Sequence, residues 1–298
     1  MIVSRRENDP LQRSLQFYPA AVLLAARGVG KSARAGRVAS RYERALTIDL
    51  ERAEGREALS DPEAFFEVNR GRFALVEGVQ RCPEVLDGLA ASLDRGGPRK
   101  PILLTGATAL AEAPGRASLG DRLRVHELGP LEVGELVAAR AFHLTARWVR
   151  GGHPASLFAE SEKQSLERRR GLLFAALERD LGTAARPAGP RVERALRMCA
   201  NAHGTALNAA RLGRSLGVTY HTARADVALL ESAFLVRLLP PFDAGRRQRR
   251  APRVYVRDSG LLHALLGIAD GHDLLGHPVR AASFSGLVVE SLLAAAEA

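Results

Sequence analysis

An α/β fold built on a parallel sheet is predicted for the first 130 residues of this 298-residue chain. Short apolar runs alternate there with helical stretches, which is typical of parallel strands joined by crossover helices. Runs such as 73–76 are continuously apolar, as expected for a sheet covered on both faces. The expected strands are 21–25, 45–50, 73–77, 102–105 and 124–128, and the expected helices include 31–42 and 85–94.

The first apolar run leads directly into a small-residue loop with the sequence Gly28-Val29-Gly30-Lys31-Ser32. A strand, a glycine turn and a Lys-Ser pair that opens a helix form the layout of a phosphate-binding P-loop. Backbone N–H groups of such a loop cradle phosphate oxygens, and the helix N-terminus adds partial positive charge. We predict that these five residues bind ATP, with Lys31 on the outer phosphates and Ser32 on Mg²⁺.

Lysine usage supports this interpretation. Lys31, Lys100 and Lys163 are the only lysines among 43 basic residues, so a lysine between glycine and serine indicates a site suited to a compact ammonium. The first glycine of the usual pattern is replaced by Ala25. The alternative is therefore a strand-to-helix turn that binds no ligand.

Composition limits the class of protein. The formal charge is +10 and the pI about 10.6, which favours acidic partners such as nucleic acid. Cys82 and Cys199 lie in no metal-binding or disulfide pattern, which fits a cytoplasmic location. No apolar run approaches the roughly 18 residues that a membrane span needs. We therefore expect no membrane partner.

The remainder of the chain reads as three further segments. Residues 131–188 are expected to form a helical lid, and 189–260 a winged-helix domain, in which 207–216 and 220–232 are the helices of a helix-turn-helix. Two short strands, 234–239 and 253–256, flank an Arg-rich loop and would form the wing. Residues 261–298 would begin a further C-terminal domain.

Positive charge is concentrated in the expected winged helix. Residues 211–257 contain ten arginines and three acids. A recognition helix beside a basic wing is a common footprint for duplex DNA. The alternative is a winged helix that only packs inside a multidomain ATPase, with a solvated Arg loop. The candidate nucleic-acid-binding residues are Arg211, Arg214, Tyr220, His221, Arg224, Arg246, Arg247, Arg249 and Arg250.

Taken together, the motifs resemble those of a bacterial and archaeal family of AAA-type P-loop ATPases that carry a C-terminal domain usually labelled DUF4143. In chain order they are RGVGKS (27–32), VQRCP (79–83), LTG (104–106), GPLE (129–132), GGHP (151–154), ERDL (178–181), LPPF (239–242) and VYVRDSGLL (254–262). The resemblance implies an AAA-type core over 1–130, a winged helix and a nuclease-like fold. Of the last, only a truncated start, with one helix over 286–298, is expected here. Such ATPases often form rings, so a homo-oligomer is compatible with the resemblance.

Two departures from the family pattern affect catalysis. The metal-binding strand normally ends in Asp-Glu, where this chain has Glu77 and Gly78. Glu77 is expected to hold Mg²⁺ through water. Gly78 cannot orient an attacking water, which forfeits roughly 10²–10⁴-fold of general-base assistance. The polar sensor that normally follows Gly106 is Ala107. Asp49 is the alternative acid, although an Asp at a strand end is usually a cap.

Arg122 occupies the Gly-Arg position of the family pattern, and the resemblance implies a catalytic arginine finger toward a phosphate. A surface salt bridge is the alternative. The sequence thus favours an ATP-binding AAA-type protein with weak or absent hydrolysis, coupled to a basic winged helix. The alternative is a DNA-binding or protein-interaction module with a non-functional nucleotide pocket. A nuclease-linked defence ATPase is a third hypothesis, which the truncated tail disfavours.

Overall fold

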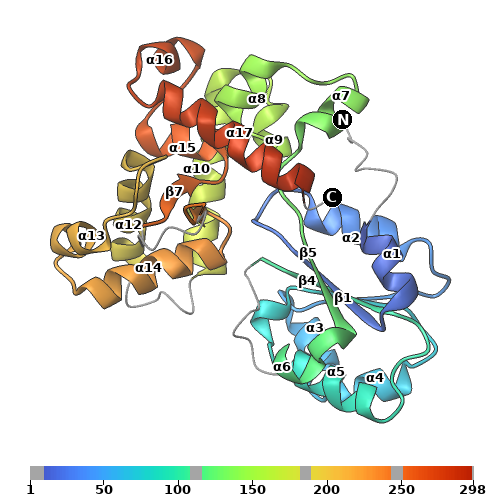
Figure 1. Ribbon diagram of the computed structural model, residues 1–298. Coiled ribbons are helices and arrows are strands. Elements are labelled where there is room, and N and C mark those ends of the chain that lie inside the picture. Colours follow the sequence, from blue (N-terminus) through green and yellow to red (C-terminus); the bar gives the residue numbers. More distant parts are fainter. Residues whose placement is uncertain (1–9, 108–115, 182–188, 243–250, 297–298) are drawn as a thin grey trace. The chain divides into compact units, whose positions relative to one another are not determined.

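The computed structural model describes residues 10–107, 116–181, 189–242 and 251–296 (Figure 1). The chain divides into two compact units. One unit consists of the described residues up to Ala25 together with Gly30–Leu128. The other consists of Ala26–Val29 together with the described residues from Gly129 onward. The boundary between the units therefore passes through the predicted P-loop.

The first unit is a five-stranded parallel sheet in the order β2-β3-β4-β1-β5, which confirms the predicted α/β fold. All residues of β1 and β4 are buried, as the continuously apolar runs require. From β1 the chain leads to β2 at one edge of the sheet, whereas from β4 it crosses β1 to reach β5 at the other edge. The strand order therefore reverses at β1. In sheets of this class, ligands bind at the carboxyl ends of the strands beside such a reversal. The strands are β1 (Ala20–Leu24), β2 (Leu46–Asp49), β3 (Ala74–Glu77), β4 (Ile102–Gly106) and β5 (Leu123–Glu127).

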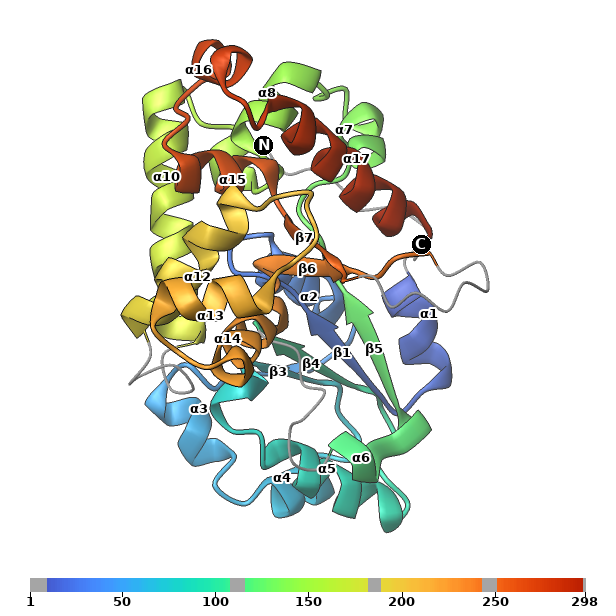
Figure 2. The same cartoon turned by 60° about the vertical axis from the view of Figure 1, so that its left-hand side comes forward.

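Helices pack against this sheet (Figure 2). The P-loop helix α2 contacts β1, β3 and β4, and α1 contacts β1. Local sequence sets the helix ends: Asp61 accepts a hydrogen bond from Ala64 N at 3.0 Å and Pro62 opens α4. The helices are α1 (Pro10–Phe17), α2 (Lys31–Ala39), α3 (Ala53–Ala58), α4 (Pro62–Val68), α5 (Val85–Asp94) and α6 (Arg116–Leu119).

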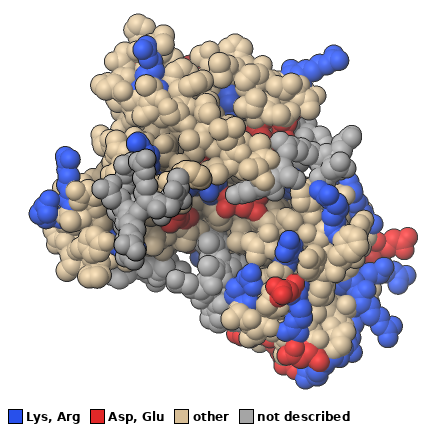
Figure 3. All heavy atoms as spheres, in the orientation of Figure 1, with Lys and Arg blue, Asp and Glu red and all other residues tan. Residues whose placement is uncertain are grey.

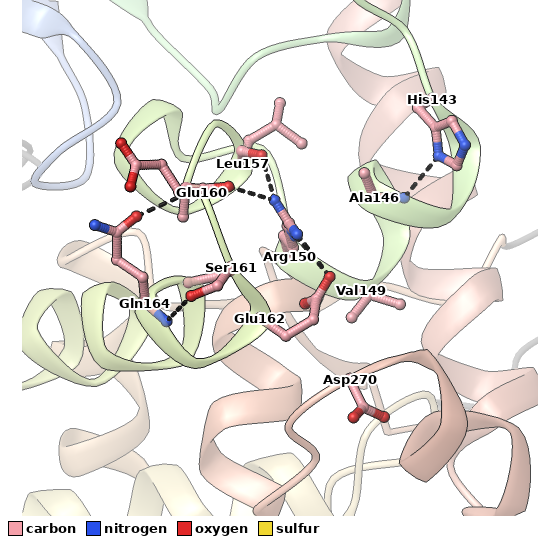
Figure 4. A network of polar contacts seen from close by, with 12 residues as sticks. His143, Ala146, Val149, Arg150, Leu157, Glu160, Ser161, Glu162, Gln164 and Asp270 are labelled. Carbon is pink, nitrogen blue, oxygen red and sulfur yellow. Dashed lines mark hydrogen bonds and ion pairs between the residues drawn. The ribbon is translucent and has the colours of Figure 1, made fainter.

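The second unit begins with four helices, of which α8, α9 and α10 are linked by the polar contacts of Arg150 (Figure 4). Arg150 ends α8 and donates to Glu162 Oε1 at 2.7–2.9 Å and to the carbonyls of Leu157 and Ala159. Ser161 caps α10 by accepting from Gln164 N. The helices are α7 (Val133–Ala138), α8 (Leu144–Arg150), α9 (Pro154–Leu157) and α10 (Glu162–Ala175), and α10 continues into a π-helical turn over Ala176–Asp180.

Three helices and an antiparallel strand pair follow, where the sequence predicts a winged helix. Gly217, at φ +70°, ends α13, and Thr219 caps α14 by accepting from Thr222 N at 3.1 Å. A bridge between Ala206 and Arg253 adds to the β6–β7 pair. The elements are α12 (Gly189–Asn201), α13 (Ala209–Leu216), α14 (Tyr220–Ser232), β6 (Val236–Leu239) and β7 (Arg253–Val256).

The last elements are α15 (Ser259–Leu266), α16 (Gly271–Gly276) and α17 (Arg280–Ala296). One apolar cluster joins residues of α10, α12, α13, α14, both strands and α15. This core thus joins described residues of the segments 131–188, 189–260 and 261–298, which by their contacts belong to one compact unit. The assignment of a helical lid, a winged helix and a further C-terminal domain to these segments stays a prediction. The final helix is also longer than the expected 286–298 and is anchored to the unit, since Trp148 Nε1 donates to Ser283 Oγ at 2.9 Å.

A buried carboxylate joins distant motifs of this unit. Asp258 caps α15 by accepting from Leu261 N at 3.0 Å, and it also accepts from Gly152 N at 2.7 Å. Burial alone would raise the pKa of Asp258, but His153, Arg147 and the two N–H donors outweigh it and lower the pKa. Asp258 therefore stays charged inside the protein, and the GGHP and VYVRDSGLL motifs have a shared structural role.

Arg169 of α10 is fully buried, with 0% of its surface exposed. Its guanidinium donates to four backbone carbonyls: Ser165 O at 3.3 Å, Val149 O at 3.2 Å, Gly260 O at 3.4 Å and Ala269 O at 2.9 Å. These acceptors come from α10, α8, α15 and the segment before α16. One side chain thus ties together four parts of the unit.

Candidate functional site

The predicted P-loop follows β1 at the carboxyl edge of the sheet. Ala25 N donates to Gly106 O at 3.1 Å, which ties the start of the loop to β4. Gly28 and Gly30 have φ of +81° and +97°, a region that side chains rarely adopt. Loops with such residues turn consecutive N–H groups inward and form concavities that bind anions. The backbone geometry therefore fits a phosphate.

Lys31 and Ser32 form the first turn of α2, with Gly30 as the preceding cap residue. Ser32 is exposed, and the first turn of α2 contains no acidic residue that would oppose an anion. An ideal Cβ placed on Gly30 has no heavy atom within 4 Å, so space is open next to the loop. The predicted binding residues 28–32 are thus contiguous around one helix N-terminus.

Two buried oxygen atoms lie side by side on the neighbouring strands. Glu77 ends β3 and pairs in register with Thr105 of β4, so their side chains point to the same face of the sheet. Glu77 Oε1 and Thr105 Oγ1 are both buried, and neither has a hydrogen-bond partner among the described residues. Buried polar groups are normally satisfied, so this pair indicates a missing polar ligand. The sequence placed Thr105 in the LTG motif but not in the predicted site, because a threonine in a strand is common.

Gly78, where the family pattern has its catalytic Glu, adopts φ +79°. Its N–H donates to Thr105 O at 2.9 Å, and it precedes a 3₁₀ helix, Val79–Arg81. Gln80 of that helix accepts a hydrogen bond from Ala107 N at 3.2 Å. Gly78 thus forms a turn at the carboxyl edge of the sheet and has no side chain that could contact a ligand.

Asp49 does not take over the lost role. Its Oδ1 accepts from Glu51 N at 3.0 Å, and its Oδ2 lies 3.3 Å from Arg52 Nε. The carboxylate therefore serves the turn after β2, as a strand-end cap does.

Arg122 is misplaced for the predicted catalytic role. It immediately precedes β5, whose first residue, Leu123, pairs with Ala20 at the amino end of β1. The P-loop follows the opposite end of β1, five residues away, which is about 16 Å at a strand rise of about 3.3 Å per residue. Arg122 instead donates to Asp94 Oδ1 at 2.6 Å. The salt bridge that the sequence offered as the alternative is therefore present, and this placement does not favour Arg122 as an arginine finger at the predicted P-loop.

The sequence analysis missed a partner of the P-loop. Arg27, directly before Gly28, forms a two-pronged ion pair with Asp180, with Nε 3.1 and 3.0 Å from the two oxygens and Nη2 2.6 Å from Oδ1. The Asp180 side chain is only 2% exposed. Both residues belong to the same compact unit. The ERDL and RGVGKS motifs contained the signal, but nothing local links residues 153 positions apart.

The predicted nucleic-acid surface is partly assembled. Arg211, Arg214, Tyr220, His221 and Arg224 are all exposed on α13 and α14. The Arg224 guanidinium lies 5.8 Å from the Tyr220 ring centroid, and the Tyr220 and His221 rings meet edge to face at 5.4 Å. Figure 3 shows Lys and Arg side chains projecting over α13.

The charge of this region is smaller than its arginine count suggests. Arg237 and Arg257 both bind the Glu290 carboxylate of α17, at 2.6 and 3.1 Å. The acid Asp226 is likewise paired, with Arg191. Four predicted contacts lie outside the described residues: Arg246, Arg247, Arg249 and Arg250. The described surface therefore depends on three arginines and two rings.

Residues 18–137 match the model of the AAA domain. The uncharacterized proteins Rv2008c of Mycobacterium tuberculosis and Mb2031c of Mycobacterium bovis are each 35% identical to this chain over 299 residues, which cover 99% of the chain and 67% of the relative. The chain belongs to the family of Rv2008c.

In this Rv2008c-family protein, residues 141–271 match the Domain of unknown function (DUF8612), in place of the DUF4143 that the resemblance implied. Among solved structures, the Bacillus subtilis DNA clamp loader delta protein (YqeN) matches with a TM-score of 0.38 and 13% identity, over 74% of this chain and 86% of that one. A variant of Thermotoga maritima RuvB matches with a TM-score of 0.36 and 18% identity, over 77% and 86%. None of the described helices has the length and hydropathy that a bilayer span requires.

Proposed function

We propose that this protein binds ATP with Mg²⁺ and hydrolyses it weakly or not at all. The observation that carries the proposal is the P-loop itself: two glycines with positive φ lead into Lys31 and Ser32 at the start of α2, in a chain with an AAA domain. The unpartnered oxygens of Glu77 and Thr105 fit the metal side of such a site.

Each residue has a distinct part in binding. The N–H groups of residues 28–32 and the Lys31 ammonium would hold the phosphates, while Ser32 and Glu77 would hold the ion through its oxygen ligands. Bound Mg²⁺ neutralises phosphate charge. The hydrolysis step lacks a base because Gly78 has no side chain to take the proton of an attacking water.

We expect millimolar Mg·ATP to raise the melting temperature of the wild-type protein and Lys31→Ala to abolish that shift. A ligand that binds only the native state stabilises it by about 2.7 kcal/mol at a hundredfold excess over Kd. The matched control is Lys100→Ala, since Lys100 is an exposed lysine that precedes the amino end of β4. Its shift should equal that of the wild type.

The same samples decide the question of hydrolysis. Phosphate release should be near background in the wild type. Robust turnover that disappears in Lys31→Ala would contradict weak hydrolysis. The absence of any thermal shift would favour the alternative, an interaction module with a non-functional pocket.

We further propose that α12–α14 with β6 and β7 act as a winged helix that contacts nucleic acid. The supporting observation is the exposed set Arg211, Arg214, Tyr220, His221 and Arg224 around the Gly217 turn. Phosphate contacts of three arginines give affinity a salt slope of about −2.7 in log–log terms for duplex DNA. Ring side chains add stacking or base-edge contact.

Duplex binding should therefore weaken about 40-fold when monovalent salt rises fourfold. Neutralising Arg211, Arg214 and Arg224 to glutamine should remove most of this salt dependence, as measured by fluorescence anisotropy. The control neutralises three exposed cations of α10, Lys163, Arg168 and Arg170, for the same change in net charge. Equal losses in both triple variants would point to general electrostatics and against a defined surface.

A further inference from the structure

The region where the P-loop meets α10 suggests a role for a residue far from any recognised motif of the nucleotide site. Arg27 and Asp180 form a fork-to-carboxylate pair, the strongest geometry for such a contact. The Arg27 side chain is 23% exposed and that of Asp180 is 2% exposed. Loss of either partner would leave a buried or half-buried charge, so the pair is held firmly.

A second contact fixes the same stretch of loop. An ideal Cβ on Gly28 would lie 2.4 Å from Leu172 Cδ2, so the Gly28 backbone packs directly on α10. Leu172 lies four residues before the π-helical turn Ala176–Asp180, and Asp180 is the last residue of that turn. Turns of this type recur at functional sites. Residues 27 and 28 are thus fastened at two points of one helix.

These contacts act on the part of the loop that must accept phosphate. Arg27 lies four residues before Lys31, and Gly28 is the first of the two glycines with positive φ. Any displacement of Arg27 moves the N–H groups that would face the ligand. We propose that Asp180 is a positioning residue, which holds the P-loop in its phosphate-binding conformation through Arg27.

This inference rests on the proposed nucleotide site and adds a link to it. Because binding free energies are reciprocal, a ligand that requires the ordered loop also stabilises the Arg27–Asp180 pair and the end of α10. Nucleotide binding would then be coupled to the DUF8612 region through the Arg27–Asp180 pair.

The test is the affinity of Asp180→Asn for Mg·ATP, measured by calorimetry, which should be at least about tenfold weaker than wild type, or 1.4 kcal/mol. Arg27→Lys keeps the charge without the two-pronged contact and should show a smaller loss in the same direction. The control is Asp226→Asn, because Arg191 and Asp226 form a similar pair, with side chains 29% and 5% exposed, away from the P-loop. Its affinity should be unchanged.

A double variant with Arg27→Asp and Asp180→Arg tests the contact itself and should recover part of the lost affinity. Wild-type affinity in Asp180→Asn, or an equal loss in Asp226→Asn, would overturn the inference. Hydrogen exchange of residues 26–32 without nucleotide gives an independent readout. Exchange of these residues should be faster in Asp180→Asn than in the wild type, and an unchanged rate would contradict the positioning role. This readout does not depend on nucleotide binding. Failure of the wild type to bind nucleotide would instead refute the proposed function.

Discussion

Replacing Arg169 with alanine should destabilise the C-terminal unit by at least about 4 kcal/mol. A hydrogen bond to a charged group contributes about 1.5–3 kcal/mol, and the Arg169 guanidinium makes four of them. The cavity left by the side chain adds to this cost. Chemical denaturation followed by the fluorescence of Trp148, the single tryptophan, measures the loss in the unit concerned.

The sequence Arg168-Arg169-Arg170 provides its own control. Arg168 and Arg170 are exposed on either side of the buried residue, and their alanine variants should change stability by less than about 0.5 kcal/mol. Arg169→Lys should be nearly as damaging as the alanine variant, since one ammonium cannot reach four carbonyls. Equal stability of the Arg168 and Arg169 variants would contradict the assigned role.

The second prediction is that the free energy of unfolding falls in acid because of two buried histidines. Burial lowers the pKa of His203 and of His263 from 6.5 to about 4. His263 lies between Val149 O at 2.9 Å and Ser283 Oγ at 2.7 Å, and His203 accepts from Val256 N at 3.0 Å. Both rings are therefore neutral in the folded protein. At His203, burial lowers the pKa by more than the nearby Glu290 raises it. At His263, burial and the charge of Arg169 both lower the pKa.

The sign follows from proton counting. Below pH 6.5 the two histidines are protonated in the unfolded chain, whereas in the folded protein they stay neutral down to about pH 4. Their contribution to the free energy of unfolding is therefore complete above pH 6.5 and is lost progressively as the pH falls below that value. Between pH 7 and pH 5 each histidine should cost about 2 kcal/mol of unfolding free energy. Urea denaturation at the two pH values measures this difference.

Single variants separate the two contributions. His263→Gln should remove about half of the pH dependence, whereas His272→Gln should leave it unchanged because His272 is exposed. The same unfolding free energy at pH 5 and pH 7 in the wild type would show that the rings are not buried in their neutral form.

What the sequence revealed was local. Apolar runs located all five strands of the parallel sheet, and the glycine, lysine and serine of the predicted P-loop fell just after β1. Both predictions depend on neighbouring residues, which the sequence displays directly. Pairings between distant residues were not visible. Arg122 pairs with Asp94, Arg237 with Glu290 and Arg27 with Asp180, and in each pair the acid comes from another part of the chain.

The length of the final helix was missed for a related reason. Gly286 suggested a helix start, but an ideal Cβ there would lie 2.4 Å from His203 Nε2, so the glycine permits close packing in the middle of α17. From sequence alone, a glycine that permits close packing looks the same as a glycine that forms a turn. The residues that surround it in space decide between the two.

The backbone at Gly78 also restricts which residues this position can hold. Any other side chain there would have to adopt φ +79°, at a cost of about 1–2 kcal/mol. A glutamate introduced at residue 78 would therefore favour a different turn before the 3₁₀ helix Val79–Arg81, and the change of side chain would also change the path of the backbone.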